Sequence, residues 1–124
     1  MGYTFIECGS EKERVHYGVL EMFLKLLVAV NTLSNEDPAR SIIEQWLSDI
    51  SPDVGYVELS SVVLSDPSAR ESLRNHTSSF INRLTDEDDL LLEEKFGTKL
   101  DESSSKARIL SEAKRLNNFL ERIS

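Results

Sequence analysis

The longest apolar stretch of the chain lies in its first third and predicts a buried helix. Residues 19–33 contain eleven apolar side chains. On a helical wheel, Glu21, Lys25 and Thr32 share one narrow wedge, and apolar residues cover most of the remaining circumference. A helix that is apolar on nearly every side is buried on several sides. We therefore expect this helix at the centre of the fold.

The start of this helix is suggested by a polar pattern upstream. Ser10 followed by Glu13 matches a capping box, in which each side chain bonds to the backbone of the other residue at a helix N-terminus. The central helix is therefore predicted to span 11–33. Residues 3–7, ahead of it, are interpreted as a short edge strand or an ordered arm.

Two Asp-Pro pairs, at 37–38 and 66–67, each mark a further helix start. Aspartate caps a helix N-terminus, and proline fits the first turn. Apolar residues recur behind each pair, and again near the end of the chain, at the spacing of one buried helical stripe. The three stripes are Ala39, Ile42, Ile43, Trp46, Leu47 and Ile50; Ala69, Leu73, Phe80 and Leu84; and Ile109, Ala113, Leu116, Leu120 and Ile123.

Two segments are harder to assign. In 54–64 the valines favour a strand and the preceding Ser-Pro-Asp favours a helix, and we favour the helix. Thr85 and Asp88 match a cap for a short helix that ends before Gly97. The predicted fold is all-α: a compact, bundle-like domain of five or six helices that comprises residues 1–124, with short connections between antiparallel neighbours.

The composition is that of one globular domain, with 124 residues, of which 40% are hydrophobic and 29% charged. The single cysteine, Cys8, excludes an internal disulfide and fits a reducing compartment. The apolar stretch at 19–33 is interrupted by charges and is shorter than the ~20 residues of a membrane span. No positively charged leader precedes it. We therefore expect a cytoplasmic protein that does not enter membranes.

The net charge of −8 disfavours nucleic acids and anionic membranes as partners. The charge is also uneven along the chain. Residues 86–102 hold eight acids and two bases, whereas residues 103–124 hold two acids and five bases. An acidic surface attracts basic molecules, so the expected partner is a protein with a basic surface.

The acidic segment contains the candidate partner-binding site. Asp86, Asp89 and Glu93 fall within about 60° of one another on a helical wheel, and Phe96 lies beside them. Carboxylates around an exposed aromatic ring are typical of a binding hot spot, because the ring supplies contact area and the charges steer the partner. In the alternative interpretation the acids complement the positive end of the helix dipole, and Phe96 belongs to the core.

A second charged row lies on the last predicted helix. Arg108, Arg115 and Arg122 follow one another at intervals of seven residues, opposite the apolar stripe. This row is interpreted either as a site for an acidic partner or a second copy of the chain, or more simply as a solvated face. Trp46 resembles an interface anchor, but its place in an apolar stripe assigns it to the core.

The sequence offers little catalytic chemistry. Cys8, with His16 or His76 as its base, is the one nucleophile pair to consider, but no family signature surrounds it. Neither histidine has a partner at metal-ligand spacing, and His76 is expected at the edge of the core. We therefore predict no catalytic residue, no metal and no cofactor, and a protein that is not an enzyme.

In length, acidity and helical content the chain resembles the small immunity proteins that bacteria make against their own nuclease toxins. The resemblance concerns the chain as a whole and transfers no residue. It implies a toxin inhibitor in the cytoplasm that acts by protein–protein interaction and covers a basic active site with its acidic surface. Two alternatives remain: a self-associating structural or adaptor module, and an enzyme of unrecognised type.

Overall fold

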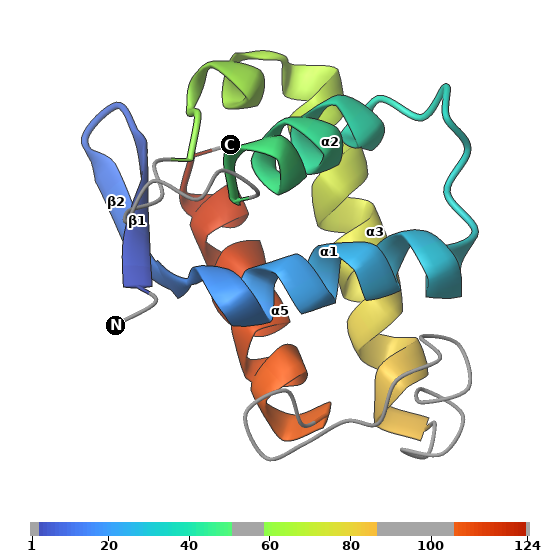
Figure 1. Cartoon of the computed structure of the whole chain (residues 1–124). Helices are drawn as coiled ribbons and strands as arrows, with labels where there is room; N and C mark the ends of the chain where they lie inside the picture. Colours follow the sequence, from blue (N-terminus) through green and yellow to red (C-terminus); the bar gives the residue numbers. More distant parts are fainter. Residues whose placement is uncertain (1–2, 51–58, 87–105, 124) are drawn as a thin grey trace.

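The structure, a computed structural model, describes residues 3–50, 59–86 and 106–123, and these form a β-hairpin packed on four helices (Figure 1). Helix α1 crosses α3 and α5, which run side by side, while α2 packs against α1 and α3 and the hairpin against α5. The elements are β1 (Tyr3–Cys8), β2 (Glu11–His16), α1 (Tyr17–Asn31), α2 (Ala39–Ile50), the 3-10 helix η1 (Val62–Ser65), α3 (Pro67–Asp86) and α5 (Lys106–Ile123).

The all-α prediction is wrong. Residues 3–16 form an antiparallel hairpin, and the described part of the chain contains four α-helices rather than five or six. The predicted 11–33 helix begins only at Tyr17. Ser10 and Glu13, interpreted as a capping box, lie in the hairpin turn and in β2. The molecule is therefore a small mixed domain, with a two-stranded sheet beside its helices.

The hairpin forms because Gly9 and Ser10 make a two-residue turn. Gly9 has a φ of +62°, in the left-handed region that glycine enters without steric cost and that this kind of turn requires at its first central position. Strand pairing then runs from Cys8 opposite Glu11 to Tyr3 opposite His16. Alternation along the strands buries Ile6 and Val15 on the inner face and leaves Tyr3 and Phe5 exposed on the outer face.

Helix α1 starts where the hairpin ends. The Nδ1 atom of His16 accepts a hydrogen bond from the backbone N–H of Val19 at 3.2 Å, so this side chain is the N-cap. The helix closes at Thr32, which adopts the left-handed conformation (φ 52°) and donates its N–H to the Val28 carbonyl. The turn from strand to helix thus depends on one imidazole.

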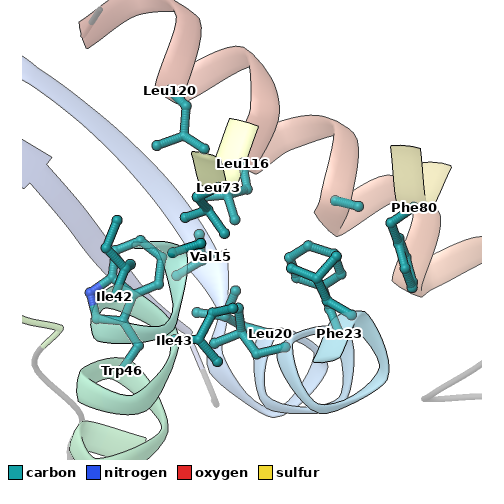
Figure 2. Packing of buried hydrophobic residues seen from close by; sticks show 14 of the residues in the cluster. Val15, Leu20, Phe23, Ile42, Ile43, Trp46, Leu73, Phe80, Leu116 and Leu120 are labelled. Atoms are coloured by element: carbon teal, nitrogen blue, oxygen red, sulfur yellow. The ribbon is translucent and has the colours of Figure 1, made fainter. Parts of the chain in front are cut away.

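One hydrophobic core joins all the described elements, and α1 lies at its centre as predicted. Phe23 of α1 meets Phe80 of α3 edge to face, with ring centroids 5.2 Å apart. Trp46 is fully buried, and its indole N–H donates to the Ser60 carbonyl at 2.8 Å. Figure 2 shows residues from the hairpin and the helices meeting in this core, among them Val15, Leu20, Phe23, Ile42, Ile43, Trp46, Leu73, Phe80, Leu116 and Leu120.

Both Asp-Pro helix starts are confirmed. The Asp37 side chain accepts the Ala39 N–H at 2.9 Å, and the Asp66 side chain accepts the Ser68 N–H at 3.0 Å. The buried stripes of α2, α3 and α5 follow the predicted spacing, with only Leu47, Ile50 and Ile123 partly exposed.

The predictions for the two segments that were harder to assign were only partly confirmed. No helix begins at Thr85, which lies inside α3 and donates its hydroxyl to the Ile81 carbonyl. Of the expected 54–64 helix, the structure shows only the start of η1 at 62–64. Residues 54–58, Asp88 and Gly97 lie outside the described residues. None of the described helices is long and apolar enough to cross a membrane.

The packing of the core predicts a large loss of stability when a buried side chain of α5 is shortened. We expect Leu116→Ala, at a fully buried position, to lower the free energy of unfolding by about 2–5 kcal/mol, because it removes buried methyl groups and leaves a cavity. Urea denaturation followed by Trp46 fluorescence measures this change. The control is Val62→Ala, which is 76% exposed and is expected to change stability by less than about 0.5 kcal/mol. Equal effects of the two variants would contradict the packing described here.

Candidate functional site

The predicted partner-binding residues lie almost entirely beyond the described residues. Asp86 is the last residue of α3. Asp89, Glu93 and Phe96 fall in 87–105, outside the described residues. The structure therefore does not test whether these four residues lie together, and the partner-binding site stays a prediction.

The arginine row of α5 is more than a solvated face, because two of its members reach the hairpin. Arg122 lies 4.0 Å from a Glu11 carboxylate oxygen and 3.8 Å from one of Glu13. Arg115 donates from Nη1 to the Arg14 carbonyl at 3.4 Å. The seven-residue spacing predicted one row of arginines, and two members of that row contact the hairpin.

A buried glutamate fastens the other end of β2 to α5. The Oε1 atom of Glu112 accepts the backbone N–H of His16 at 3.1 Å, and Arg115 Nη1 lies 3.8 Å from its Oε2. Glu112 is only 5% exposed, so burial raises its pKa, although the His16 N–H and the nearby arginines partly oppose this. Burial and the charge of Arg108 lower the pKa of His16, which favours the neutral ring that caps α1.

These residues line two adjoining hollows between the hairpin and α5, which we call the hairpin–α5 cleft. The larger hollow measures about 280 Å³ and the smaller about 100 Å³, and they share Tyr3 and Arg115. The larger is lined by Tyr3, Glu13, Arg14 and Arg115, and the polar lining of the smaller adds His16, Arg108, Ser111 and Glu112. The cleft was not predicted from the sequence, because residues 11–16, which form β2 in one of its walls, were interpreted as the start of a helix.

A second polar cluster contains the three residue types of a hydrolase triad in a different arrangement. The Asp37 carboxylate accepts the Ser72 hydroxyl at 2.6 Å, and its other oxygen lies 2.8 Å from Nε2 of His76. In a triad the serine donates to the histidine, which activates it as a nucleophile. Here both side chains bind the aspartate instead. The cluster therefore fastens the start of α2 to α3, and His76 lies at the edge of the core as predicted.

The charge of Asp37 is stabilised by these contacts. Burial raises the pKa of its carboxyl, but the hydrogen bonds from Ser72, from the Ala39 N–H and from His76 together outweigh it and lower the pKa overall. The signal available in the sequence was the Asp-Pro helix start alone. The bonds to Ser72 and His76 span 35 and 39 residues, which no local pattern reveals.

The Cys8–His16 pair considered from the sequence does not form. Cys8 lies at the turn end of the hairpin opposite Glu11, and His16 lies at the other end opposite Tyr3. Five residues of strand separate these ends, which is roughly 17 Å at the usual rise. Cys8 also does not precede a helix N-terminus, so the expected stabilisation of a thiolate there is absent.

Within the described ranges, no group of three or more His, Cys, Asp or Glu side chains is arranged to hold a metal ion. Comparison with known proteins found no match for this chain among protein-family models, curated proteins or solved structures.

The Asp37 cluster generates a prediction about stability. We expect Asp37→Ala to lower the free energy of unfolding by about 2–4 kcal/mol, because it removes a helix cap and two hydrogen bonds to a charged group. Asp66→Ala is the matched control, since it removes only a cap, and should cost about 1 kcal/mol. Since the folded-state pKa of Asp37 is lowered, its contribution is present above the unfolded pKa and is lost as the pH falls through the folded one. Urea titrations at neutral and acidic pH test both statements, and equal losses in the two variants would contradict them.

Glu112 generates the opposite pH dependence. Because burial raises its pKa, the folded state holds the proton of Glu112 more tightly than the unfolded state does, so its contribution is present below the pKa of an unfolded-state glutamate and is lost as the pH rises through the raised folded pKa. Glu112→Gln keeps an oxygen for the His16 N–H and removes the titration. We expect the stability of this variant relative to wild type to improve as the pH rises, as measured by urea denaturation.

The control for this experiment is Glu121→Gln, which removes the same charge from an exposed position of the same helix. A pH dependence of equal size in the two variants would show that burial of Glu112 is not its cause.

Proposed function

We propose that this chain is a non-enzymatic binding protein of the cytoplasm that docks a basic protein partner through its acidic segment, residues 86–102. One observation carries this proposal. The described residues are nearly balanced, with 13 acidic and 12 basic side chains, whereas 87–105 contains seven acidic and two basic ones. Most of the net charge of −8 is therefore carried by one segment.

Within the described residues, several opposite charges also lie next to one another. Lys25 lies 3.8 Å from Glu21, and Arg40 lies 3.2 Å from Glu44. The hairpin and α5 pair their charges in the same way, through Arg122 with Glu11 and Glu13. Neighbouring charges of opposite sign cancel at a distance, so the long-range field of the protein is dominated by its unbalanced segment. Such a field steers a basic partner during association.

The framework attaches the acidic segment at both ends. Helix α3 ends at Asp86 and α5 begins at Lys106, and these two helices pack side by side with those ends at the same end of the molecule (Figure 1). A binding segment attached at two points loses less freedom on binding than a free tail does. The attachment of the acidic segment to α3 and α5 thus supports a binding function.

The finer form of the proposal is an immunity-type protein that neutralises a nuclease-like toxin. It rests on the resemblance to immunity proteins and on the excess of acids, since nucleases carry basic active sites for their anionic substrates. In this form Phe96 is the anchor, and Asp86, Asp89 and Glu93 face the partner. The gene of such a protein is expected directly downstream of a toxin gene.

Charge reversal tests the proposal. The partner is first captured from a lysate of the source cells at low salt and identified as a basic protein. We expect Asp89→Lys combined with Glu93→Lys to slow its association by at least about tenfold and to weaken the salt dependence, because steering charges act on the rate of encounter. Phe96→Ala should instead speed dissociation by about tenfold. Surface plasmon resonance measures both rates.

The matched control reverses two acids of the described framework. Glu36→Lys combined with Glu71→Lys changes the net charge by the same amount, at exposed positions without an ion pair in the described residues. We expect little change in the association rate. Equal slowing by both double variants would show that net charge alone matters, and failure of any basic protein to bind at low salt would overturn the proposal.

A further inference from the structure

The hairpin–α5 cleft presents a guanidinium group that has no carboxylate partner. Arg14 lies on the outer face of β2, with its guanidinium carbon 3.9 Å from the centroid of the Tyr3 ring. No carboxylate of the described residues lies within ion-pair distance of Arg14, in contrast to Arg40 and Arg122. This cation–π contact holds the guanidinium at the Tyr3 ring and uses none of its N–H groups.

A second guanidinium lines the same hollow. Arg115 uses Nη1 for the Arg14 carbonyl and lies near Glu112 through the same atom. Its Nε and Nη2 make no hydrogen bond to the described residues. Tyr3 also lines the hollow, and its hydroxyl makes no hydrogen bond to the described residues. Residues from β1, β2 and α5 that carry donor groups thus line one space of about 280 Å³.

The two carboxylates at this cleft already have partners. Glu13 lies 3.8 Å from Arg122, which is outside the hollow. Glu112 accepts the His16 N–H and faces Arg115. Arg108 adds a third cation at the adjoining hollow. The cleft is therefore a locally cationic site in an acidic protein.

We propose that the hairpin–α5 cleft binds a phosphate group between Arg14 and Arg115, with the Tyr3 hydroxyl as a further donor. A tetrahedral dianion matches two guanidinium groups in charge, and its oxygens accept more hydrogen bonds than a carboxylate can. The volume admits a phosphate and the first atoms of an attached group. This site shares no residue with the acidic segment, and the proposal does not rest on the function proposed above.

Titration with orthophosphate, at constant ionic strength and neutral pH, tests the site. The arginine Nε–Hε resonances in ¹H–¹⁵N spectra report on each guanidinium directly. We expect saturable shifts for Arg14 and Arg115, and much weaker binding of acetate. Absence of saturation, or equal affinity for acetate, would overturn the proposal.

Variants locate the binding. Arg14→Gln should weaken phosphate binding by about tenfold or more, and Tyr3→Phe, which keeps the ring beneath Arg14, by a few-fold. Arg74→Gln is the matched control, because Arg74 lines another hollow of about 280 Å³ together with Arg70 and Glu71. Equal weakening by Arg14→Gln and Arg74→Gln would reduce the effect to net charge and overturn the proposal.

Three further measurements separate phosphate binding from effects on folding and from the acidic segment, and distinguish between two kinds of phosphate ligand. If Arg14→Gln disturbs the hairpin, Arg14→Lys preserves the charge while removing the planar fork, and it too should weaken binding. The acidic-segment variant Asp89→Lys with Glu93→Lys should bind phosphate as wild type does, which separates this site from the proposed function. Phosphoserine is compared with orthophosphate: tighter binding of phosphoserine identifies an esterified phosphate as the ligand, and the reverse order identifies the free anion.

Discussion

Helix α1 carries apolar side chains around most of its circumference, and the other elements are arranged to keep water from it. Seven of its residues are buried, and it contacts α2, α3, α5 and β2. Burying each large apolar side chain contributes about 1.5–3 kcal/mol, so these seven together are comparable to the ~5–15 kcal/mol net stability of a whole domain. The hairpin and the amphipathic helices each cover part of a helix whose solvated face is confined to the narrow strip that carries Glu21 and Lys25.

The sequence predicted those parts of the fold that depend on neighbouring residues. The Asp37 and Asp66 caps and the three apolar stripes were recognised because they act within a few turns of one helix. A strand at 3–7 was one of the two predicted possibilities, but the second strand was missed because it places Glu11 and Glu13 on the inner face, where a strand pattern calls for apolar residues. These positions are acceptable because Arg122, from the far end of the chain, pairs with both. The local signal, a Gly9-Ser10 turn, was present but was outweighed by an apparent capping box. The cleft and its contacts could not be predicted, because its two walls lie about 100 residues apart in the sequence.

In two polar clusters, residue types that are common in active sites hold elements of the fold together. Asp37 joins α2 to α3 through Ser72 and His76, and Glu112 joins the hairpin to α5 through the His16 backbone. In both, a partly or fully buried carboxylate is satisfied by donors from a distant element, as buried polar groups must be. Their opposite pKa directions follow from the number of donors each carboxylate receives relative to its burial. The residue types alone would not distinguish such a joint from a catalytic site, whereas the hydrogen-bond partners do.

The contacts between the hairpin and α5 also bear on the order in which the protein folds. The bonds from His16 to Glu112 and from Arg115 to Arg14 close over 96 and 101 residues of sequence. Contacts between such distant residues form late, because the chain loses much of its freedom before they begin to stabilise it. During synthesis the hairpin is made long before α5, so the face of β2 that packs against α5 stays uncovered until residues 106–123 have been made. The hairpin and α5 therefore leave the ribosome at very different times. A nascent chain that stalls before α5 is made would expose the hairpin to solvent and to chaperones.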